Sequence, residues 1–582
     1  MEKYVYQDVQ LFLEGDIWID GQKEIELRNS GGGAVVEALI SRYRHVGDDF
    51  LKAVKGGFRL TLWDRDKQKL IVAVDPFATK PIYYLVQNGR FAFGPGVSCI
   101  SRVPGFDREV DPNVLYFYLN HSFVPAPHSI YRKIRRLEPG QYIVWHKENL
   151  SIRQYWDIQY NEDQRLSADI ASDLVYAGVD RALQFYVASQ SCTETEMGAF
   201  LSGGTDSSTL VGLLSKIQNK PVNAFSVGFD EQAYNEIHYA RVAAKHYGAV
   251  AHECFVSPED ALKALPVLAE SFDEPFGNSS AIPTYFCLRM AKEAGVKVMF
   301  AGDGGDELFA GNERYLSEKV FLPFDLLPAG AQALSKRVAR CLPALYPLGK
   351  IRRYIERASE PNPDRFFYYQ LFLSRNEGAL FTADFMAQVD QAFPLAVPRR
   401  HYSNVQSAAA LNRLLYLDLK MCIADNDLFK VNRMAESIDI KVCFPYLDRN
   451  LAELTGKIPV SLKLKGSEKR YIFKKAFGKL LPEEILKKKK HGFGLPIVGW
   501  LRNHSGFKDL ARALLLDNSS LQRGYFQRPA MEALFARQEQ EAGNLYSSAI
   551  WNLMMLELWH QNHFDRLVNP HLGITFASQY GV

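Results

Sequence analysis

The fold is decided by the stretch Phe200-Leu201-Ser202-Gly203-Gly204-Thr205-Asp206-Ser207-Ser208, in which an apolar run enters two glycines and small hydroxyl residues follow. Glycine lets backbone N–H groups approach an anion closely, and the N-terminus of a following helix adds donors. The stretch therefore predicts a phosphate-binding turn between a strand and a helix. It is not a Walker A loop, because no lysine follows the second glycine in the required place. A tight turn with Asp and Ser as helix caps is the structural alternative.

A second acidic loop follows about one hundred residues later. The apolar run Val296–Ala301 ends in Gly302-Asp303-Gly304-Gly305-Asp306-Glu307-Leu308-Phe309-Ala310-Gly311. Ligands of open α/β sheets collect outside the carboxyl ends of the strands, where both loops are expected. An acidic surface turn is the alternative for this loop taken alone.

The carboxylates of the two loops have distinct predicted roles. A carboxylate inside a phosphate loop repels phosphate unless a cation lies between them, so Asp206 is predicted to hold Mg²⁺. We expect Asp306 to share that Mg²⁺ on a triphosphate. Asp303 or Glu307 then remains for proton transfer.

The chain around these loops alternates helical periodicity with short apolar runs at Met197–Leu201, Val222–Val227 and Val296–Ala301. Strand, helix, strand at this spacing predicts a parallel α/β sheet. Beyond about residue 310 the pattern is mostly helical, and Ala549–His560 is predicted as a strongly apolar final helix.

Residues 1–160 have a different, β-rich pattern. Short β-prone runs are separated by turn signals such as Asp64-Arg65-Asp66 and Asn88-Gly89, which predicts antiparallel hairpins in one module. The polar stretch Tyr160–Asp169 is predicted to be the linker out of it. The β-prone runs are Phe58–Trp63, Lys69–Val74, Pro81–Val86 and Arg90–Phe93.

Composition excludes several classes of protein. Hydrophobic residues make up 47% and charged residues 23% of the 582 residues, which is typical of a globular protein and not of a disordered chain. A net charge of +3 is too balanced for nucleic-acid binding by bulk charge. The seven cysteines form no CxxC pair, so neither a disulfide framework nor a zinc site is indicated. We see no signal-peptide layout and no long apolar run, and expect a cytoplasmic protein without a membrane span.

Together the two loops resemble the asparagine synthetase family, whose synthetase domain carries SGGxDSS and G[DE]GxDE[LV]FxGxxxY strings. Further strings occur in the same order: Ser226–Phe229 is similar to the strand over the adenine, Asp273-Glu274-Pro275 to the segment flanking the nucleotide, and Lys489–Pro496 to the KxGFxxP loop. Asp75–Tyr84 is similar to part of the family's glutaminase domain.

The resemblance implies an α/β plus α+β chain of two domains. Residues 1–160 would be a degenerate glutamine amidotransferase-like domain, an Ntn-type sandwich of antiparallel sheets. Residues 170–582 would be a parallel-sheet ATP-pyrophosphatase domain with helical additions. ATP and pyrophosphate are expected at Leu201, Ser202, Gly203, Gly204, Thr205, Asp206, Ser207, Ser208, Val227, Gly228, Gly302 and Lys490, with Mg²⁺ on Asp206 and Asp306 and with Asp303, Glu307 and Lys490 as catalytic residues.

Departures from the family pattern concern the nitrogen donor. A glutaminase of this type needs an N-terminal cysteine after Met1 is removed, whereas Glu2 stands there and the first cysteine is Cys99. The family's Asn-Gly-Glu glutamine string aligns with Glu14-Gly15-Asp16, and an acidic pair with Gly31-Gly32-Gly33-Ala34. We therefore predict that glutamine is not the nitrogen donor.

The acceptor string also departs from the family. In Lys430–Asp448 the family's Glu and Arg become Lys441 and Cys443, and an Asp becomes Asn432. We expect these swaps to alter recognition of a small amino acid.

These features predict an AMP-forming amide ligase that uses ATP and Mg²⁺. Relatives with an inactive glutaminase use an amine already on the substrate, and we place lasso-peptide cyclases first, with a peptide or small carboxylate as substrate and a leader-peptide protease and leader-binding protein as partners. β-Lactam synthetases carry Tyr where Asp303 stands, and ammonia-fed asparagine synthesis stays open as a further alternative. A tRNA-modifying thiolase lacks its catalytic cysteines here, and a non-catalytic scaffold is expected to lose Asp206, Asp306 or Lys490. No nucleic acid or membrane partner is expected.

Overall fold

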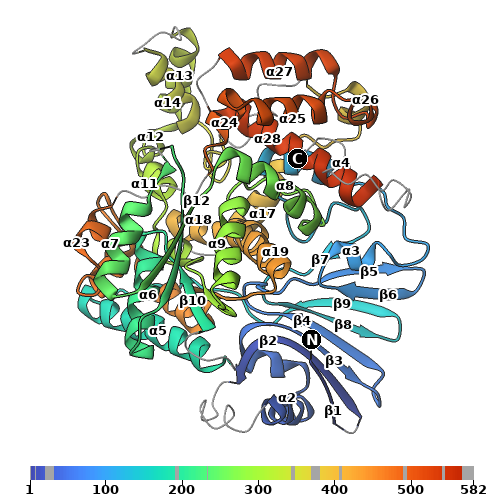
Figure 1. Ribbon diagram of the computed structural model, residues 1–582, viewed down its shortest axis with the longest axis vertical. Helices are drawn as coiled ribbons and strands as arrows, with labels where there is room; N and C mark the ends of the chain where they lie inside the picture. The colour runs from blue at the N-terminus through green and yellow to red at the C-terminus, as the bar shows by residue number, and fades with distance from the viewer. Residues whose placement is uncertain are drawn as a thin grey trace.

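The computed structural model describes residues 2–6, 8–19, 32–190, 196–231, 234–342, 348–368, 380–405, 409–488, 495–540 and 544–565. Figure 1 shows the N-terminal strands gathered at one end of the molecule, beside a second region built on a parallel sheet and capped by helices of the C-terminal part.

The N-terminal region consists of two antiparallel sheets, as the sequence predicted. One sheet has the strand order β1-β2-β3-β4-β8-β9 and the other β6-β5-β7. Asn88 and Gly89 both have positive φ values, +54° and +71°, in the turn between β5 and β6. This is the backbone of a tight hairpin turn, which Asn-Gly favours. The strands are β1 (Glu2–Tyr6), β2 (Val9–Ile19), β3 (Val54–Asp64), β4 (Lys69–Val74), β5 (Tyr83–Gln87), β6 (Arg90–Gly94), β7 (Arg135–Arg136), β8 (Gln141–His146) and β9 (Asn149–Gln154).

The second region has a five-stranded sheet whose order is β12-β11-β10-β13-β14 and whose pairs are all parallel. The three predicted strands are confirmed, and the structure adds β12 and β14 at the two edges. Charged and polar residues in these edge strands hid them from the apolar pattern. The strands are β10 (Met197–Phe200), β11 (Asn223–Gly228), β12 (Val250–Phe255), β13 (Val298–Phe300) and β14 (Lys441–Cys443).

Adjacent strands of this sheet carry the two predicted loops. β10 and β13 pair directly, with Met197 opposite Val298 and Ala199 opposite Phe300. Because both strands run the same way, the loops after Phe200 and after Phe300 leave the sheet at the same edge. Figure 1 shows α6 and α7 to one side of the sheet and α9 and α19 to the other.

Helices account for most of the described chain beyond residue 310, as predicted, with only β14 and the short β15–β16 ladder as strands. The longer helices are α2 (Gly32–Val46), α4 (Pro112–His121), α5 (Ala168–Ala188), α6 (Thr205–Gln218), α7 (Ile237–Tyr247), α8 (Pro258–Ser271), α9 (Ala281–Glu293), α13 (Ala329–Cys341), α14 (Leu348–Ala358), α17 (Phe393–Asn404), α18 (Ala410–Asp418), α19 (Leu428–Ile438), α20 (Arg449–Lys457), α25 (Ser505–Leu515), α27 (Arg528–Gln540) and α28 (Asn544–Trp559). The shorter elements are η1 (Gly47–Ala53), α3 (Val97–Ile100), α10 (Gly305–Phe309), α11 (Glu313–Lys319), α12 (Leu322–Asp325), α16 (Ala383–Met386), η4 (Leu419–Asp427), η5 (Pro445–Leu447), α21 (Val460–Lys463), β15 (Leu464–Lys465), β16 (Glu468–Lys469), α22 (Tyr471–Phe477), α23 (Glu483–Lys487), α24 (Ile497–Asn503), α26 (Asn518–Gln522) and η6 (His560–Phe564).

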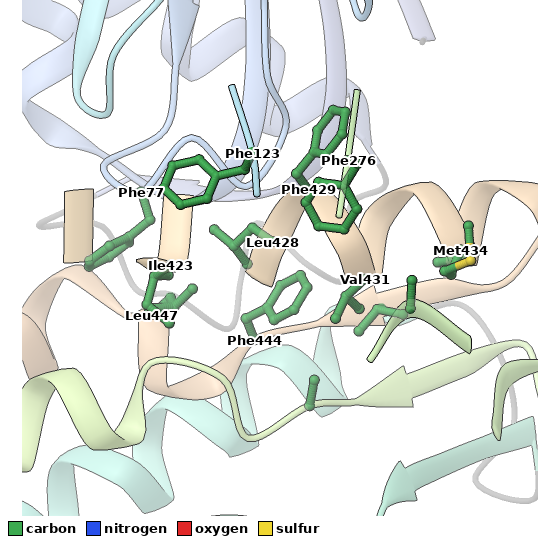
Figure 2. Close-up of a cluster of buried hydrophobic side chains, with 14 of the residues drawn as sticks. Phe77, Phe123, Phe276, Ile423, Leu428, Phe429, Val431, Met434, Phe444 and Leu447 are labelled. Atoms are coloured by element: carbon green, nitrogen blue, oxygen red, sulfur yellow. The ribbon is translucent and has the colours of Figure 1, made fainter. Parts of the chain in front are cut away.

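The two regions share one hydrophobic core. Figure 2 shows Phe77 and Phe123 of the N-terminal region packed with Leu428, Phe429 and other apolar side chains of η4 and α19. These side chains are buried, and burying a large apolar side chain contributes roughly 1.5–3 kcal/mol. The regions are therefore joined by packing as well as by the linker.

The predicted apolar helix near the end of the chain is α28, and it is buried. The backbone carbonyl of Asn552 accepts from the Tyr118 hydroxyl at 2.7 Å, and the Trp559 indole donates to the Asp273 carbonyl at 3.0 Å. α28 thus contacts both regions at once. Among the described residues, no helix is long and apolar enough to span a bilayer.

Candidate active site

A cavity of about 630 Å³ opens at the shared edge where β10 and β13 end. Residues of both predicted loops line it, among them Ser202, Asp206, Gly302 and Asp306. This volume lies in the range of small-molecule sites. We call it the nucleotide cavity.

The phosphate loop reverses direction at Gly203, which has a φ of +67°, and a Cβ there would press against Tyr239 and Ala240. α6 begins after Gly204 and has no side-chain cap on its N-terminus. Its first N–H groups therefore remain available for an anion. Ser207 Oγ accepts from the backbone N–H of Ser202 at 3.2 Å, which holds the loop closed on itself.

Asp206 and Asp306 are brought together around one cation, the Arg470 guanidinium. Arg470 Nη1 lies 2.5 Å from Asp206 Oδ2 and 3.4 Å from Asp306 Oδ1, and Nη2 also contacts Asp206. A Cβ at Gly311 would overlap Asp306 Oδ1, so the close approach of this loop requires glycine. The two carboxylates thus face the same point in the cavity.

This carboxylate pair fits the predicted Mg²⁺. Magnesium sites commonly use one or two carboxylates and complete the shell with water and substrate phosphates. Within the described ranges, no cluster of three or more His, Cys, Asp or Glu could hold a metal. The donor set suits an ion that arrives with a triphosphate, and Mg²⁺ binding stays a prediction.

The predicted proton-transfer residues, Asp303 and Glu307, line the same cavity. Lys430 Nζ donates to Asp427 Oδ1 at 2.8 Å, and burial raises the pKa of Asp303 while the Lys430 charge opposes that rise. Burial, with Asp418 and Asp427 nearby, raises the pKa of Glu307 to about 8. The raised pKa of Glu307 favours Asp303 as the general base of the two, and that role stays a prediction.

The structure places most, but not all, of the predicted ATP residues on the cavity. Those on its wall are Leu201, Ser202, Gly204, Thr205, Asp206, Ser207, Val227 and Gly302, together with Asp303, Asp306 and Glu307. Gly203 turns toward α7, Ser208 is fully buried, and Gly228 packs on Phe255, so none of these three lines the cavity. These three shape or support the walls, and direct contact of any of these residues with a nucleotide stays a prediction.

Lys490, with the rest of Lys489–Gly494, lies outside the described residues. The residue before this segment, Lys488, enters the nucleotide cavity. Its Nζ donates to the Ser202 carbonyl at 3.2 Å and pairs with Glu236 at 3.1 Å. The basic run therefore begins beside the phosphate loop, while the role of Lys490 remains a prediction.

Asp273-Glu274-Pro275 does not itself line the nucleotide cavity. Asp273 accepts from the Ser98 backbone N–H at 3.0 Å, and Glu274 accepts from the Tyr83 hydroxyl at 2.5 Å. The charges of this segment therefore bind the N-terminal region. Asn278 and Ser280, which follow the segment, do line the cavity, so its place beside a nucleotide stays a prediction.

Lys441 and Cys443 also lie away from the nucleotide cavity. Lys441 Nζ pairs with Asp16 Oδ1 at 2.6 Å, across the boundary between the two regions. Cys443 Sγ lies 3.9 Å from Asp16 Oδ2. β14 is an edge strand, and its side chains turn toward the N-terminal sheet. These swaps therefore change the interface, and their effect on acceptor recognition stays a prediction.

A second cavity, of about 380 Å³, lies at this boundary around Glu14-Gly15-Asp16. Arg59 Nη2 pairs with Glu14 Oε2 at 2.5 Å, and Asp16 pairs with Lys441. Burial raises the pKa of Glu14, but the Arg59 charge and hydrogen bond outweigh burial and leave that pKa lowered. Both carboxylates that replace the family's glutamine string are thus held by protein cations. We call this space the interdomain cavity. Of the aligned glycines, Gly31 lies outside the described residues, and Gly32 opens α2.

Three cavity residues were missed from the sequence. Arg470 follows β16 and has a left-handed backbone conformation with a φ of +57°. No local sequence pattern predicts that this residue lies in the cavity. Lys430 was noticed only as part of the acceptor string. Lys488 belongs to a basic run that normally lies in solvent. Only tertiary placement, with side chains nearly buried beside the loops, identifies them.

The fold and this site define an ATP-dependent ligase with an amidotransferase-type module. The family model described as Asparagine synthase matches residues 178–561, and the one described as Glutamine amidotransferase domain matches residues 8–156. The chain belongs to the asparagine synthase family of ATP-dependent amide-forming ligases.

Relatives match over almost the whole chain. Asparagine synthetase [glutamine-hydrolyzing] 1 of Bacillus subtilis is 26% identical over 96% of this chain and 86% of its own length. A putative asparagine synthetase [glutamine-hydrolyzing] of Mycobacterium tuberculosis is 26% identical over 97% and 86%. Amidase chry2 of Gibberella zeae is 21% identical over 87% and 80%.

Proposed function

We propose that this protein adenylates a carboxylate of a peptide and closes it onto an amine of the same peptide, forming a macrolactam as lasso-peptide cyclases do. ATP would be the co-substrate, with Mg²⁺ on Asp206 and Asp306. A leader-peptide protease and a leader-binding protein are the partners that this chemistry implies.

The first step is activation of the carboxylate. A carboxylate oxygen attacks the α-phosphorus of ATP, and the bond to the β-phosphate bridging oxygen breaks to release pyrophosphate. Bound Mg²⁺ would supply charge neutralisation on the phosphates. The loop from Ser202 to Ser207 brings N–H groups to the cavity, and Arg470 and Lys488 bring positive charge, which would stabilise the leaving pyrophosphate.

The second step forms the amide. The amine nitrogen attacks the acyl carbon, the C–O bond to AMP breaks, and the amine loses one proton. Asp303 would take that proton, and Lys430 beside it favours the ionised form of Asp303. An acyl-adenylate hydrolyses readily, so the buried walls of the cavity must limit water.

The observation that supports an amine other than glutamine-derived ammonia is the interdomain cavity. Glu14 and Asp16 occupy the aligned glutamine string, and Arg59 and Lys441 already bind them. Glutamine would have to displace both ion pairs. The sequence also has Glu2 where the family has its nucleophilic cysteine.

A second candidate is ammonia-dependent asparagine synthesis, because the relatives named above are asparagine synthetases matched along nearly their full length. One experiment separates the two. The protein with ATP and Mg²⁺ is assayed for pyrophosphate–ATP exchange with free aspartate and with peptides that have a free N-terminal amine and an internal Asp or Glu.

The expected result is exchange with a peptide, followed by a product that has lost one water by mass spectrometry. Exchange with aspartate alone, and labelled asparagine from labelled ammonium, would replace cyclisation with the second candidate. If none of the carboxylates supports exchange, ligase activity itself is contradicted. Release of glutamate from glutamine would contradict the prediction that the amidotransferase-like domain is inactive.

A further inference from the structure

One end of the molecule carries a projecting pair of helices, α13 and α14, that pack on each other. Figure 1 shows this α13–α14 pair extending beyond the parallel-sheet region. Its base has a small core of its own, in which Phe321 stacks on Tyr354 at 5.4 Å and packs with Phe324 and Ala358. The pair is therefore an anchored structure that presents its outer surface to solvent.

That surface is apolar to an unusual degree. Of the seventeen large apolar side chains that are exposed in the described part of the chain, four lie on α13 and α14 and four more lie just before α13, between residues 320 and 327. On α13, Leu334 is 63% exposed and Val338, one helical turn later, 49%. On α14, Ile351 is 48% exposed. Clustered exposed apolar side chains of this kind mark interaction sites.

The same surface is strongly basic. Residues 328–358 contain seven Lys or Arg and a single acidic residue, Glu356, although the whole chain has a net charge of only +3. The exposed cations on the two helices are Lys336, Arg337, Arg340, Lys350 and Arg353. A partner that complements this surface must combine apolar and acidic groups.

A groove connects the base of the α13–α14 pair to the nucleotide cavity. It has a volume of about 810 Å³ and is walled by Leu316, Val320, Arg357 and Phe366. Glu313 and Ser467 line both this groove and the nucleotide cavity, so the two spaces adjoin. A free amino acid would leave most of such a volume empty, whereas an extended peptide segment could fill it.

We propose that the α13–α14 pair and this groove form a docking surface for an extended peptide segment rich in acidic and apolar residues, which leads the reacting carboxylate into the nucleotide cavity. The proposal rests on the proposed function for the identity of the occupant. It adds the chemical character of the substrate and the path by which it enters. Apolar side chains would contact Leu334 and Val338, and carboxylates would pair with Arg337 and Arg340.

The test measures binding without ATP, so that it does not depend on catalysis. The probe is a fluorescein-labelled peptide of repeated Gly-Leu-Glu units, followed by anisotropy, and the matched probe has Lys in place of Glu. Two double variants change the surface, Arg337→Glu with Arg340→Glu and Leu334→Ser with Val338→Ser. The control double variant, Arg181→Glu with Lys263→Glu, reverses exposed charges on α5 and α8.

The full-length wild type is expected to bind the acidic probe about tenfold more tightly than the lysine probe. Each surface double variant should weaken binding of the acidic probe about tenfold or more, and the control should stay within about twofold. A photoreactive version of the probe should cross-link to tryptic peptides from residues 313–366. ATP binding should be unchanged in all variants.

Equal binding by the wild type and the surface variants would overturn the proposal. So would binding of phosphatidylglycerol vesicles or duplex DNA that depends on the same residues while the acidic peptide does not bind. Peptide binding with the expected dependence, but without exchange for any carboxylate, would support the docking surface and contradict the proposed ligase substrate, so the two failures are distinguishable.

Discussion

The two cavities differ in what their charged side chains face. In the nucleotide cavity, Asp206 and Asp306 converge with Arg470 on open space beside an uncapped helix N-terminus. In the interdomain cavity, Glu14 pairs with Arg59 and Asp16 pairs with Lys441, and of these two cations only Lys441 lines the cavity. The carboxylates are paired with protein cations in both cavities. The difference is that the nucleotide cavity also has an uncapped helix N-terminus, whereas the interdomain cavity has the Asp16–Lys441 pair, which joins the two regions. Within one fold, the nucleotide cavity thus has groups that suit an anion, and the interdomain cavity contributes an ion pair to the contact between the two regions.

The largest effect should come from the nucleotide cavity. Asp206→Asn removes the charge that would hold Mg²⁺ on the triphosphate, and we expect pyrophosphate–ATP exchange to fall about 1,000-fold. Asp173→Asn, at an exposed position on α5, is the matched control and should keep exchange within about twofold. If the Asp206→Asn variant keeps its pyrophosphate–ATP exchange, Asp206 does not hold a Mg²⁺ ion that the reaction needs. The comparison between the two cavities would then be wrong.

The stability of the contact between the two regions should depend on pH through Glu274. Burial raises the pKa of Glu274 to about 7, with Arg136 opposing. A carboxyl whose folded pKa lies above its unfolded value contributes most stability below the unfolded pKa, and that contribution is lost as pH rises through about 7.

Denaturant unfolding of the wild type and Glu274→Gln should therefore diverge between acidic pH and pH 8. We expect wild-type stability, relative to the variant, to fall by up to about 3 kcal/mol over this range. Glutamine cannot titrate, and its amide oxygen can still accept from the Ile130 backbone N–H, which Glu274 does at 2.8 Å. Parallel pH profiles would show that Glu274 does not titrate against the interface.

Arg470→Ala should produce a moderate loss in the nucleotide cavity. The variant removes a cation that lies between the two carboxylates and beside Thr205. We expect ATP to bind about tenfold more weakly by calorimetry, because one charge-assisted contact to phosphate is lost. Arg470→Lys should recover part of the affinity. Tighter ATP binding by the alanine variant would instead mean that Arg470 blocks the site.

The smallest effect should come from the interdomain ion pair. Lys441→Met leaves the nearly buried Asp16 without this cation, and we expect a loss of about 1 kcal/mol in unfolding free energy. Exchange activity should stay within about twofold, since Lys441 does not line the nucleotide cavity. A large loss of activity with unchanged stability would return Lys441 to the role in acceptor recognition that its position in the sequence suggested.

Local signals predicted much of this molecule. The apolar runs that end before Ser202 and Gly302, together with the glycines of the two loops, were sufficient to predict the parallel sheet. They also predicted that the two loops meet, because adjacent parallel strands end at one edge of a sheet. Asn88-Gly89 predicted its hairpin for the same local reason.

The sequence did not reveal contacts that depend on distant partners. Asp273, Glu274 and Lys441 resemble site residues by their order in the chain, but each meets the N-terminal region only after the chain has folded. Arg470 shows the converse, since it lies far from both loops in sequence and between their carboxylates in space. The sequence gives the sign of each side-chain charge, but tertiary packing determines which residue that side chain pairs with.

The contacts of α28 have a consequence for dissecting the protein. Tyr118, Ser122 and Gly277 all bond to residues of that helix, which is synthesised hundreds of residues later. A fragment ending near residue 160 would leave the apolar face around Phe117 and Phe123 exposed to water. During translation, Tyr118 and Ser122 must wait for the last long helix to supply their partners. The amidotransferase-like module is therefore completed by the far end of the polypeptide, and we expect that it cannot be moved to another protein as a separate domain.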